Sequence, residues 1–198
     1  KLKAEGRIDK TPVLNVMHAP IKTMVSLWPP RFQFGMEQRT VEKSCPVCIS
    51  EDQRSHFEGL FGYPARTCLN GIDPDHYKSI GLPRTDRFLF FARYSSIKGA
   101  DLGIAACKAI GAGLDCFGDT AITNEPEYFA ACQKAADGKQ IKINGGVGRG
   151  ETVWHMSRAN CFLHPNQRFR EPLGLAPLEA QACGLPVISQ KRSPQELP

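Results

Sequence analysis

Two cations stand on a short loop between an apolar run and a predicted helix. Arg93 directly follows the run Phe88–Ala92, which is typical of a buried strand, and Lys98 with Gly99 precedes the helix. In an open α/β sheet, ligands bind at the carboxyl ends of the strands, where the amides and the dipole of a helix N-terminus attract anions. These charges favour a diphosphate. The alternative is that both are ordinary solvated loop charges, because most Arg and Lys side chains are exposed.

Two glutamates flank a second predicted helix start, near the end of the sequence. Glu171 and Glu179 are separated by a stretch in which Gly174 and Leu175 are expected to begin the helix. Carboxylates accept hydrogen bonds from sugar or ribose hydroxyls, and the unpaired amides of a helix start bind phosphate. We therefore predict that this segment contacts both ends of a nucleotide sugar.

A zinc site is the alternative chemistry that the cysteines offer. Cys45 and Cys48 form a CxxC pair, which could bind zinc together with His56 and Cys68. The intervals fit no common zinc motif, and a single CxxC lacks the second pair that makes such motifs specific. We interpret the two residues as a structural, metal-free thiol pair.

Other enzyme classes are disfavoured by what the motifs lack. His155 and His164 have no Ser or Cys with an acidic partner at an informative spacing for a hydrolase triad. The run GGVGRG is not in the G-x-G-x-x-G register of a dinucleotide-binding dehydrogenase. No Asp-x-Asp pair stands at a strand end to hold a divalent metal against a diphosphate. We expect Arg93, Lys98 and helix amides to neutralise its charge, with neither metal nor cofactor.

The elements that must position these residues alternate between strand and helix from Asp86 onward, which predicts an α/β fold with a doubly wound parallel sheet. The predicted strands are Phe88–Ala92, Leu114–Phe117, Ile141–Asn144, Cys161–His164 and Pro186–Ser189. The predicted helices are Ala100–Ala112, Glu125–Ala136, Gly150–Ala159 and Leu175–Cys183.

The part before Asp86 is less regular and is expected to be the remnant of a second α/β domain. VLNVMHAP and CPVCIS are typical of strands, and EDQRSHFEGLFG is typical of a helix that begins after a serine. The Gly- and Pro-rich connection that follows separates two predicted domains. We expect a partial N-terminal domain with its connector in residues 1–82. Residues 83–198 are expected to form a ligand-binding domain that is truncated at its end.

Composition restricts the partners. The sequence has 198 residues, 41% of them hydrophobic, and a net charge of +5. Its Lys and Arg residues are scattered rather than gathered into a stripe, which disfavours nucleic acid. No apolar run approaches the roughly 20 residues of a membrane span, although peripheral membrane contact is compatible with the charge. Most of the eight cysteines lie in apolar stretches. We therefore expect reduced thiols and a cytoplasmic protein.

The order of these motifs resembles a known family. FARYSSIKG, INGGV, FLHP and EPLGLAPLEAQACGLPVI follow one another as in the family 4 retaining glycosyltransferases of the two-domain GT-B architecture. The resemblance extends from Asn70 to Glu196. It implies that the second half of the chain is the Rossmann-like, nucleotide-sugar-binding half of such an enzyme.

The resemblance also implies a role for each charged residue. Arg93 and Lys98 would hold the donor diphosphate. Glu179 would bind the ribose, and Glu171 would contact the transferred sugar.

Several positions would act through their backbone. Gly146 and Val147 would lie against the base, and the amides of Gly174 and Leu175 would meet the phosphates or the sugar. Gly118 would allow close approach to the cleft at a strand end.

His18, at the end of VLNVMHAP, corresponds to a family histidine that points toward the donor sugar. A structural histidine is the alternative at this position.

The implied reaction is the transfer of a hexosyl group from a nucleotide-diphospho-sugar to a sugar or lipid-linked acceptor, with retention of configuration. Two alternatives remain open. The chain could be a non-catalytic nucleotide-sugar-binding fragment, or it could come from a nucleotide-sugar epimerase of the same architecture. The sequence identifies neither the base nor the acceptor.

Overall fold

The computed structural model describes residues 14–17, 44–121, 125–166, 168 and 171–190. Contacts within the chain divide it into two compact units. The first comprises residues 1–71 together with 171–173, and the second comprises residues 72–170 together with 174–198. The division of the whole protein into domains near residue 82 stays a prediction.

The first unit contains a three-stranded parallel sheet in the order β1-β2-β3 and one described helix, α3. Their bounds are Leu14–Met17 for β1, Cys45–Cys48 for β2, Glu51–Phe61 for α3 and Arg66–Thr67 for β3. Ser50 caps the helix, because its hydroxyl accepts a hydrogen bond from the Gln53 amide at 3.1 Å. The helix ends at Gly62, which has a φ of 61°. The predicted serine-initiated helix is therefore confirmed.

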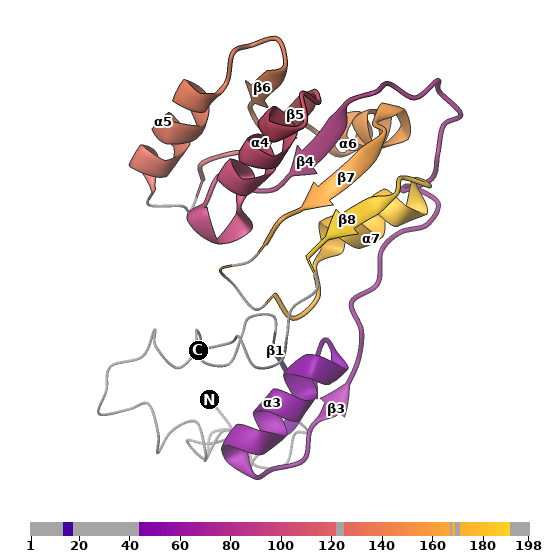
Figure 1. Ribbon diagram of the computed structural model, residues 1–198. Coiled ribbons are helices and arrows are strands. Elements are labelled where there is room, and N and C mark those ends of the chain that lie inside the picture. The colour runs from indigo at the N-terminus through magenta and orange to yellow at the C-terminus, as the bar shows by residue number, and fades with distance from the viewer. Residues whose placement is uncertain (1–13, 18–43, 122–124, 167, 169–170, 191–198) are drawn as a thin grey trace. The chain divides into compact units, whose positions relative to one another are not determined.

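The second unit is built on a five-stranded parallel sheet in the order β6-β5-β4-β7-β8 (Figure 1). The strands are β4 (Phe88–Phe91), β5 (Leu114–Phe117), β6 (Ile141–Asn144), β7 (Cys161–His164) and β8 (Val187–Ser189). Each predicted strand is present, two of them one residue shorter than expected. Consecutive strands run outward from β4 to one edge, and the chain then returns to β7 beside β4, which is the order of a doubly wound sheet.

Each helix of the second unit connects two parallel strands. The helices are α4 (Ala100–Ala109), α5 (Pro126–Ala135), α6 (Arg149–Arg158) and α7 (Leu175–Ala182). Helix α4 ends three residues before the predicted Ala112, because Gly111 adopts a φ of 69°, which a right-handed helix does not accommodate. Helix α5 begins with Pro126, whose missing amide is not needed at that position.

Two hydrophobic clusters cover the two faces of this sheet. On one face, strand residues such as Leu114 and Cys116 pack with Ile104 and Cys107 of α4 and with Cys132 of α5. On the other face, the side chains of Leu89, Phe117 and Phe162 pack against α6 and α7 through Val153, Met156, Ala180 and Cys183. Because alternate strand residues point to opposite faces, the near-continuous apolar strands supply both clusters.

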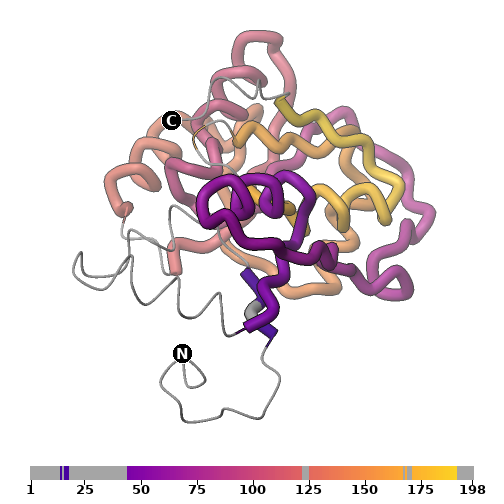
Figure 2. Tube along the Cα trace, turned by 90° about the horizontal axis from the view of Figure 1, so that it is seen from below, coloured from indigo at the N-terminus to yellow at the C-terminus, as the bar shows by residue number. Residues whose placement is uncertain are grey.

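The predicted fold class is confirmed: the structure is α/β, with a doubly wound parallel sheet and a second, smaller parallel sheet. The path from β7 through α7 to β8, coloured orange to yellow, can also be followed from below in Figure 2. No helix among the residues that the structure describes is long and apolar enough to cross a membrane.

Candidate functional site

The carboxyl ends of β4 and β7 mark the point where the strand order of the second unit reverses. These two strands are neighbours, but the segments that follow them lead to α4 on one face and to α7 on the other. Such a switch point opens a crevice at the carboxyl edge of the sheet, where α/β proteins bind ligands. Arg93 and Lys98 lie on the segment that follows β4, so the fold places both predicted cations at this edge.

The segment after β4 is a compact loop that contains a short 3-10 helix, Ser96–Lys98. The side chain of Arg93 is exposed, and that of Lys98 is half-buried. Gly99, with a φ of 76°, ends the turn and precedes α4. A Cβ atom at this position would lie 2.8 Å from the carbonyl oxygen of Pro165, in the segment after β7. The absence of a side chain therefore lets the two segments of the switch point approach each other.

Glu125 holds this loop from the next crossover. Its carboxylate accepts hydrogen bonds from the Ser95 hydroxyl at 2.6 Å and from the Ser96 amide at 2.8 Å. The bond from Ser95, followed by those from Ser96, holds the pKa of Glu125 below its usual value. An ionised carboxylate immediately before α5 thus fixes the backbone on which Lys98 is carried.

Tyr94 anchors the same loop in the core. Its side chain is fully buried, and its hydroxyl interacts with the carbonyl oxygens of Cys116 at 3.0 Å and Asn144 at 2.8 Å. Burial raises the pKa of Tyr94. A Cβ atom on Gly118 would overlap the carbonyl oxygen of Ala92. The ends of β4, β5 and β6 are therefore joined by one buried hydroxyl and by one close backbone approach. The predicted role of Gly118 at the cleft stays a prediction.

Arg168 connects the segment after β7 to the start of α4. Its guanidinium donates to both carboxylate oxygens of Asp101, at 2.9 and 2.8 Å, and to the carbonyl oxygen of Ser96 at 2.9 Å. Tyr128 donates to the same carboxylate at 2.7 Å. The pKa of Asp101 is lowered, first by the bond from Arg168. Because one arginine contacts both segments, it ties them together at the carboxyl edge of the sheet.

Helix α7 begins after Gly174, as predicted. Leu175 is exposed, and a Cβ atom on Gly174 would lie 3.2 Å from the side chain of Pro177 and 3.5 Å from Nε2 of His164. Glu179, on the same helix, is half-buried. It interacts with the hydroxyl of Tyr77, a residue that packs in the core cluster beside α7.

The segment after β6 carries the two residues predicted to contact a base. Gly146 is exposed and lies near Asp119, which follows β5. Val147 is half-buried and packs against the core cluster that contains Tyr77. Val147 and Glu179 are thus linked through one cluster, which brings the predicted base-binding and ribose-binding positions to the same part of the second unit.

The contacts described above do not include two of the predicted site residues. His18 lies outside the described residues. Glu171 is half-buried and belongs to the first unit. The roles of His18 and Glu171 stay predictions.

The CxxC pair of the first unit consists of free thiols. Cys48 is buried, and this burial raises its pKa to about 11, so the thiol stays protonated at neutral pH. Within the described ranges, no group of three or more His, Cys, Asp or Glu residues could hold a metal ion. The interpretation of Cys45 and Cys48 as structural, metal-free thiols stays a prediction.

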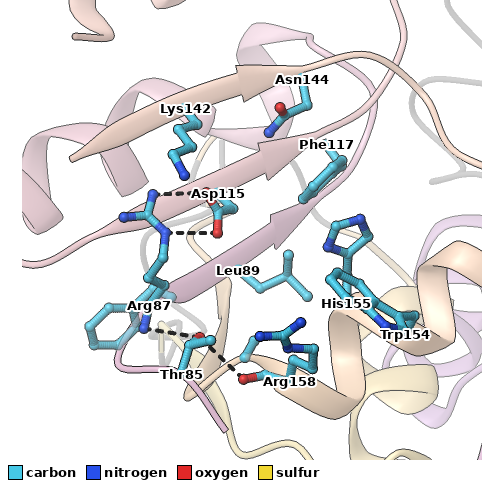
Figure 3. A pocket seen from close by; sticks show the side chains of 12 residues that line it. Thr85, Arg87, Leu89, Asp115, Phe117, Lys142, Asn144, Trp154, His155 and Arg158 are labelled. Carbon is cyan, nitrogen blue, oxygen red and sulfur yellow. Dashed lines mark hydrogen bonds and ion pairs between the residues drawn. The ribbon is translucent and has the colours of Figure 1, made fainter. Parts of the chain in front are cut away.

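A cavity of about 320 Å³ lies against the sheet of the second unit, beside α6 (Figure 3). None of the predicted site residues is among the 12 that line it. Arg87 and Asp115 are paired there by two bonds of 2.8 Å, and the ring of His155 lies 4.0 Å from that of Phe117. Burial lowers the pKa of His155. Because Arg87 also donates to three backbone carbonyls, we interpret this cluster as a structural tie between strands.

Several residues of the site were not found by sequence reasoning. They are Tyr77, Tyr94, Asp101, Glu125, Tyr128 and Arg168. Each is a single polar residue whose partner is distant in the chain, so no local spacing marks it. The one sequence signal for some of them is a hydroxyl or carboxylate group in or beside the Arg93–Gly99 segment. Such groups are common in loops, so this signal is weak.

Known structures resemble this arrangement. AviGT4, a glycosyltransferase involved in avilamycin A biosynthesis, is 26% identical, with a TM-score of 0.63 over 74% of this chain and 48% of that one. Sucrose-phosphate synthase from Thermosynechococcus elongatus is 20% identical, with a TM-score of 0.73 over 89% of this chain and 49% of that one. Alr3699/HepE from Anabaena, solved in complex with UDP-glucose, is 20% identical, with a TM-score of 0.70 over 92% of this chain and 54% of that one. The chain thus spans about half the length of these proteins.

A search of curated protein sequences finds no significant match. The sequence profile of one family covers the switch point, the segment after β6 and helix α7, matching residues 75–196. Because these residues make up more than half of the sequence, the chain belongs to the family of glycosyl transferases group 1.

Proposed function

We propose that the protein transfers a hexosyl group from a nucleotide-diphospho-sugar to a sugar or lipid-linked acceptor, with retention of configuration and without a divalent metal. The observation that carries this proposal is the placement of Arg93 and Lys98 on the loop at the switch point of a group 1 glycosyltransferase fold. Glu125, Tyr94 and Arg168 hold that loop in place.

The proposed reaction needs no nucleophile from the protein. The bond between the sugar C1 and the diphosphate oxygen breaks, and negative charge grows on the leaving diphosphate. Arg93 and Lys98 stabilise this charge electrostatically. The acceptor hydroxyl attacks C1 from the same face, and its proton passes to the departing phosphate oxygen. One C–O bond is broken, one is formed, and the product keeps the donor configuration.

The remaining predicted residues bind the donor. Glu179 accepts hydrogen bonds from the ribose hydroxyls, Gly146 and Val147 contact the base, and Glu171 contacts the sugar. The amides of Gly174 and Leu175 at the start of α7 add positive potential near the phosphates. The UDP-glucose in the structure of Alr3699/HepE supports uracil as the first base to test.

A non-catalytic binding fragment is the second candidate for this chain. It is favoured by one observation, namely that the chain spans only about half of each protein to which it is similar. Donor binding without transfer to added acceptors would support the fragment. Transfer would support an enzyme, and the anomeric configuration of its product, read by proton NMR, would test retention.

Calorimetric titration with nucleoside diphosphates and their sugars, in the presence of EDTA, tests the binding proposal. We expect one nucleotide to bind and Arg93→Ala to weaken its binding by about 10- to 100-fold, because hydrogen bonds to charged groups are the strong ones. Lys134→Ala is the matched control. It removes one exposed charge from the last turn of α5, which leads to the amino end of β6.

The outcomes of this titration separate the parts of the proposal. Equal affinity in Arg93→Ala and Lys134→Ala would overturn the role of Arg93. Binding that appears only after a divalent metal is added would overturn metal independence. No binding of any nucleotide would overturn the assignment of the crevice as a donor site.

A further inference from the structure

Tyr77 lies near the start of the second unit, in a segment outside any helix or strand, yet its side chain is only 6% exposed. The turn before it is fixed. The Asp73 carboxylate accepts from the amides of Asp75 and His76 at 3.0 and 3.2 Å, and the Tyr77 amide donates to the Asp73 carbonyl at 2.9 Å. The ring packs in the cluster that contains Leu89, Val153, Met156 and Ala180. A short loop thus inserts one aromatic ring beneath α6 and α7.

The hydroxyl of this ring meets two charged side chains at the edge of the cluster. It interacts with Glu179 of α7 and with Arg149, the first residue of α6. A phenylalanine would fill the same apolar space, so the hydroxyl is needed only for these polar contacts. Burial, and then the neighbouring Glu179 carboxylate, raise the pKa of Tyr77, while Arg149 lowers it. The hydroxyl therefore stays protonated at neutral pH and can donate to the carboxylate.

A carboxylate held in this way can still bind a ligand. Its two oxygens offer about four lone-pair sites, so a bond from Tyr77 leaves sites for the two ribose hydroxyl donors. An unrestrained glutamate would lose rotamer freedom when it bound such a ligand, and this loss would weaken binding. A glutamate that Tyr77 already restrains loses less freedom on binding, so its affinity for the ligand is higher. Val147 packs against the same cluster as Tyr77, so the predicted base-contacting segment borders the cluster from which Tyr77 reaches this carboxylate.

We propose that Tyr77 is a positioning residue that holds Glu179 in the orientation that accepts hydrogen bonds from the ribose hydroxyls of the donor nucleotide. This inference rests on the proposed function. It adds a determinant of ribose recognition that comes from the segment before β4 rather than from the loops at the carboxyl edge of the sheet.

The test compares two probes on the same chain: the nucleoside diphosphate that the wild type binds best, and its 2′,3′-dideoxy form. The wild type should prefer the ribose form. Tyr77→Phe should lose about tenfold in affinity for the ribose form, because a hydrogen bond that orients a charged acceptor is removed, and should keep its affinity for the dideoxy form. Tyr63→Phe, which removes a phenolic hydroxyl from the first unit, is the control and should match the wild type for both.

Glu179→Gln completes a double-mutant cycle. Alone it should abolish the preference for ribose, and adding Tyr77→Phe should cause no further loss. Equal losses on both probes in Tyr77→Phe, or a retained ribose preference, would overturn the positioning role while leaving the donor site intact. A wild type that binds the two probes equally would instead overturn ribose recognition by Glu179, and no binding at all would overturn the proposed function. Each of these last two results would also overturn the positioning role of Tyr77.

Discussion

Glu125 is a single carboxylate on which the geometry of the candidate diphosphate loop depends. It accepts from the Ser95 hydroxyl and the Ser96 amide, and its pKa is held below the ordinary value of 4.5. A carboxyl whose folded-state pKa is lowered stabilises the fold above its unfolded pKa, and this contribution is lost as the pH falls through the folded pKa. The ordering of the loop is thus coupled to the ionised form of one residue.

Glu125→Gln should therefore destabilise the chain at neutral pH and progressively less as the pH falls below about 4.5. Urea unfolding of the wild type and the variant at a series of pH values from 7 to 3 measures the difference directly. Glu127→Gln, which changes an exposed carboxylate two residues along the same segment, is the control. A difference between wild type and Glu125→Gln that stays constant with pH would contradict a stabilising role for the ionised carboxylate.

The residues of the candidate site that the sequence predicts are those whose chemistry is locally patterned. Arg93, Lys98 and Gly174 could be singled out because each stands beside a strand end or a helix start. Glu125 could not, because its partner Ser95 lies 30 positions away. Arg168 binds Asp101 across 67 positions. Such pairs form only when the crossovers have folded, so they leave no trace in local spacing.

At the scale of elements, strands were predictable because a sheet covered on both faces requires near-continuous apolar runs. The run Phe88–Phe91 is buried or half-buried throughout. Helix ends were less predictable. Ala100–Ala112 reads as one apolar stretch, but α4 ends at Ala109, where the chain turns through Ile110 and Gly111. The end of the helix depends on which residue of the turn adopts a left-handed conformation. The spacing of apolar residues along the sequence does not indicate that residue.

Gly99 and Gly111 lie at opposite ends of α4. Comparing them distinguishes two reasons for a glycine, namely a left-handed backbone conformation and a lack of space for a side chain. Both have positive φ values, 76° and 69°. A Cβ atom at Gly111 would meet nothing within 4 Å, whereas one at Gly99 would lie 2.8 Å from the Pro165 carbonyl oxygen. Alanine in a left-handed conformation costs about 1–2 kcal/mol, and overpacking costs about 1–3 kcal/mol more.

We therefore expect Gly111→Ala to lower the free energy of unfolding by about 1–2 kcal/mol, and Gly99→Ala to lower it by about 2–5 kcal/mol in total. Urea denaturation monitored by circular dichroism provides both values. Gly99→Ala should also weaken donor binding in calorimetry, because the segments after β4 and β7 must move apart. Equal destabilisation by the two variants would show that the approach to Pro165 does not constrain the loop.

At the scale of the whole molecule, each unit has hydrophobic clusters of its own among the described residues. Met17, Cys48 and Phe57 are buried members of the cluster in the first unit. The second unit has clusters on both faces of its sheet. Since hydrophobic burial is the main favourable term in folding, we expect the two units to differ in the urea concentration at which they unfold.

The cysteines make this difference measurable, because both units contain buried thiols. Only a thiolate reacts with an alkylating reagent, and burial both shields Cys48 and raises its pKa to about 11. Cys116 and Cys161 of the second unit are also buried, with raised pKa values. Cys68 is exposed and should react in the folded protein.

Pulsed alkylation at increasing urea concentration, read by mass spectrometry of the cysteine peptides, should show three steps. Cys68 is labelled without urea, Cys48 in one transition, and Cys116 with Cys161 in another, because each buried thiol reacts when its own cluster opens. Labelling rates in full denaturant provide the reference for each peptide. If Cys48, Cys116 and Cys161 became reactive together, the two units would unfold as one cooperative structure, and the expectation of separate transitions would be wrong.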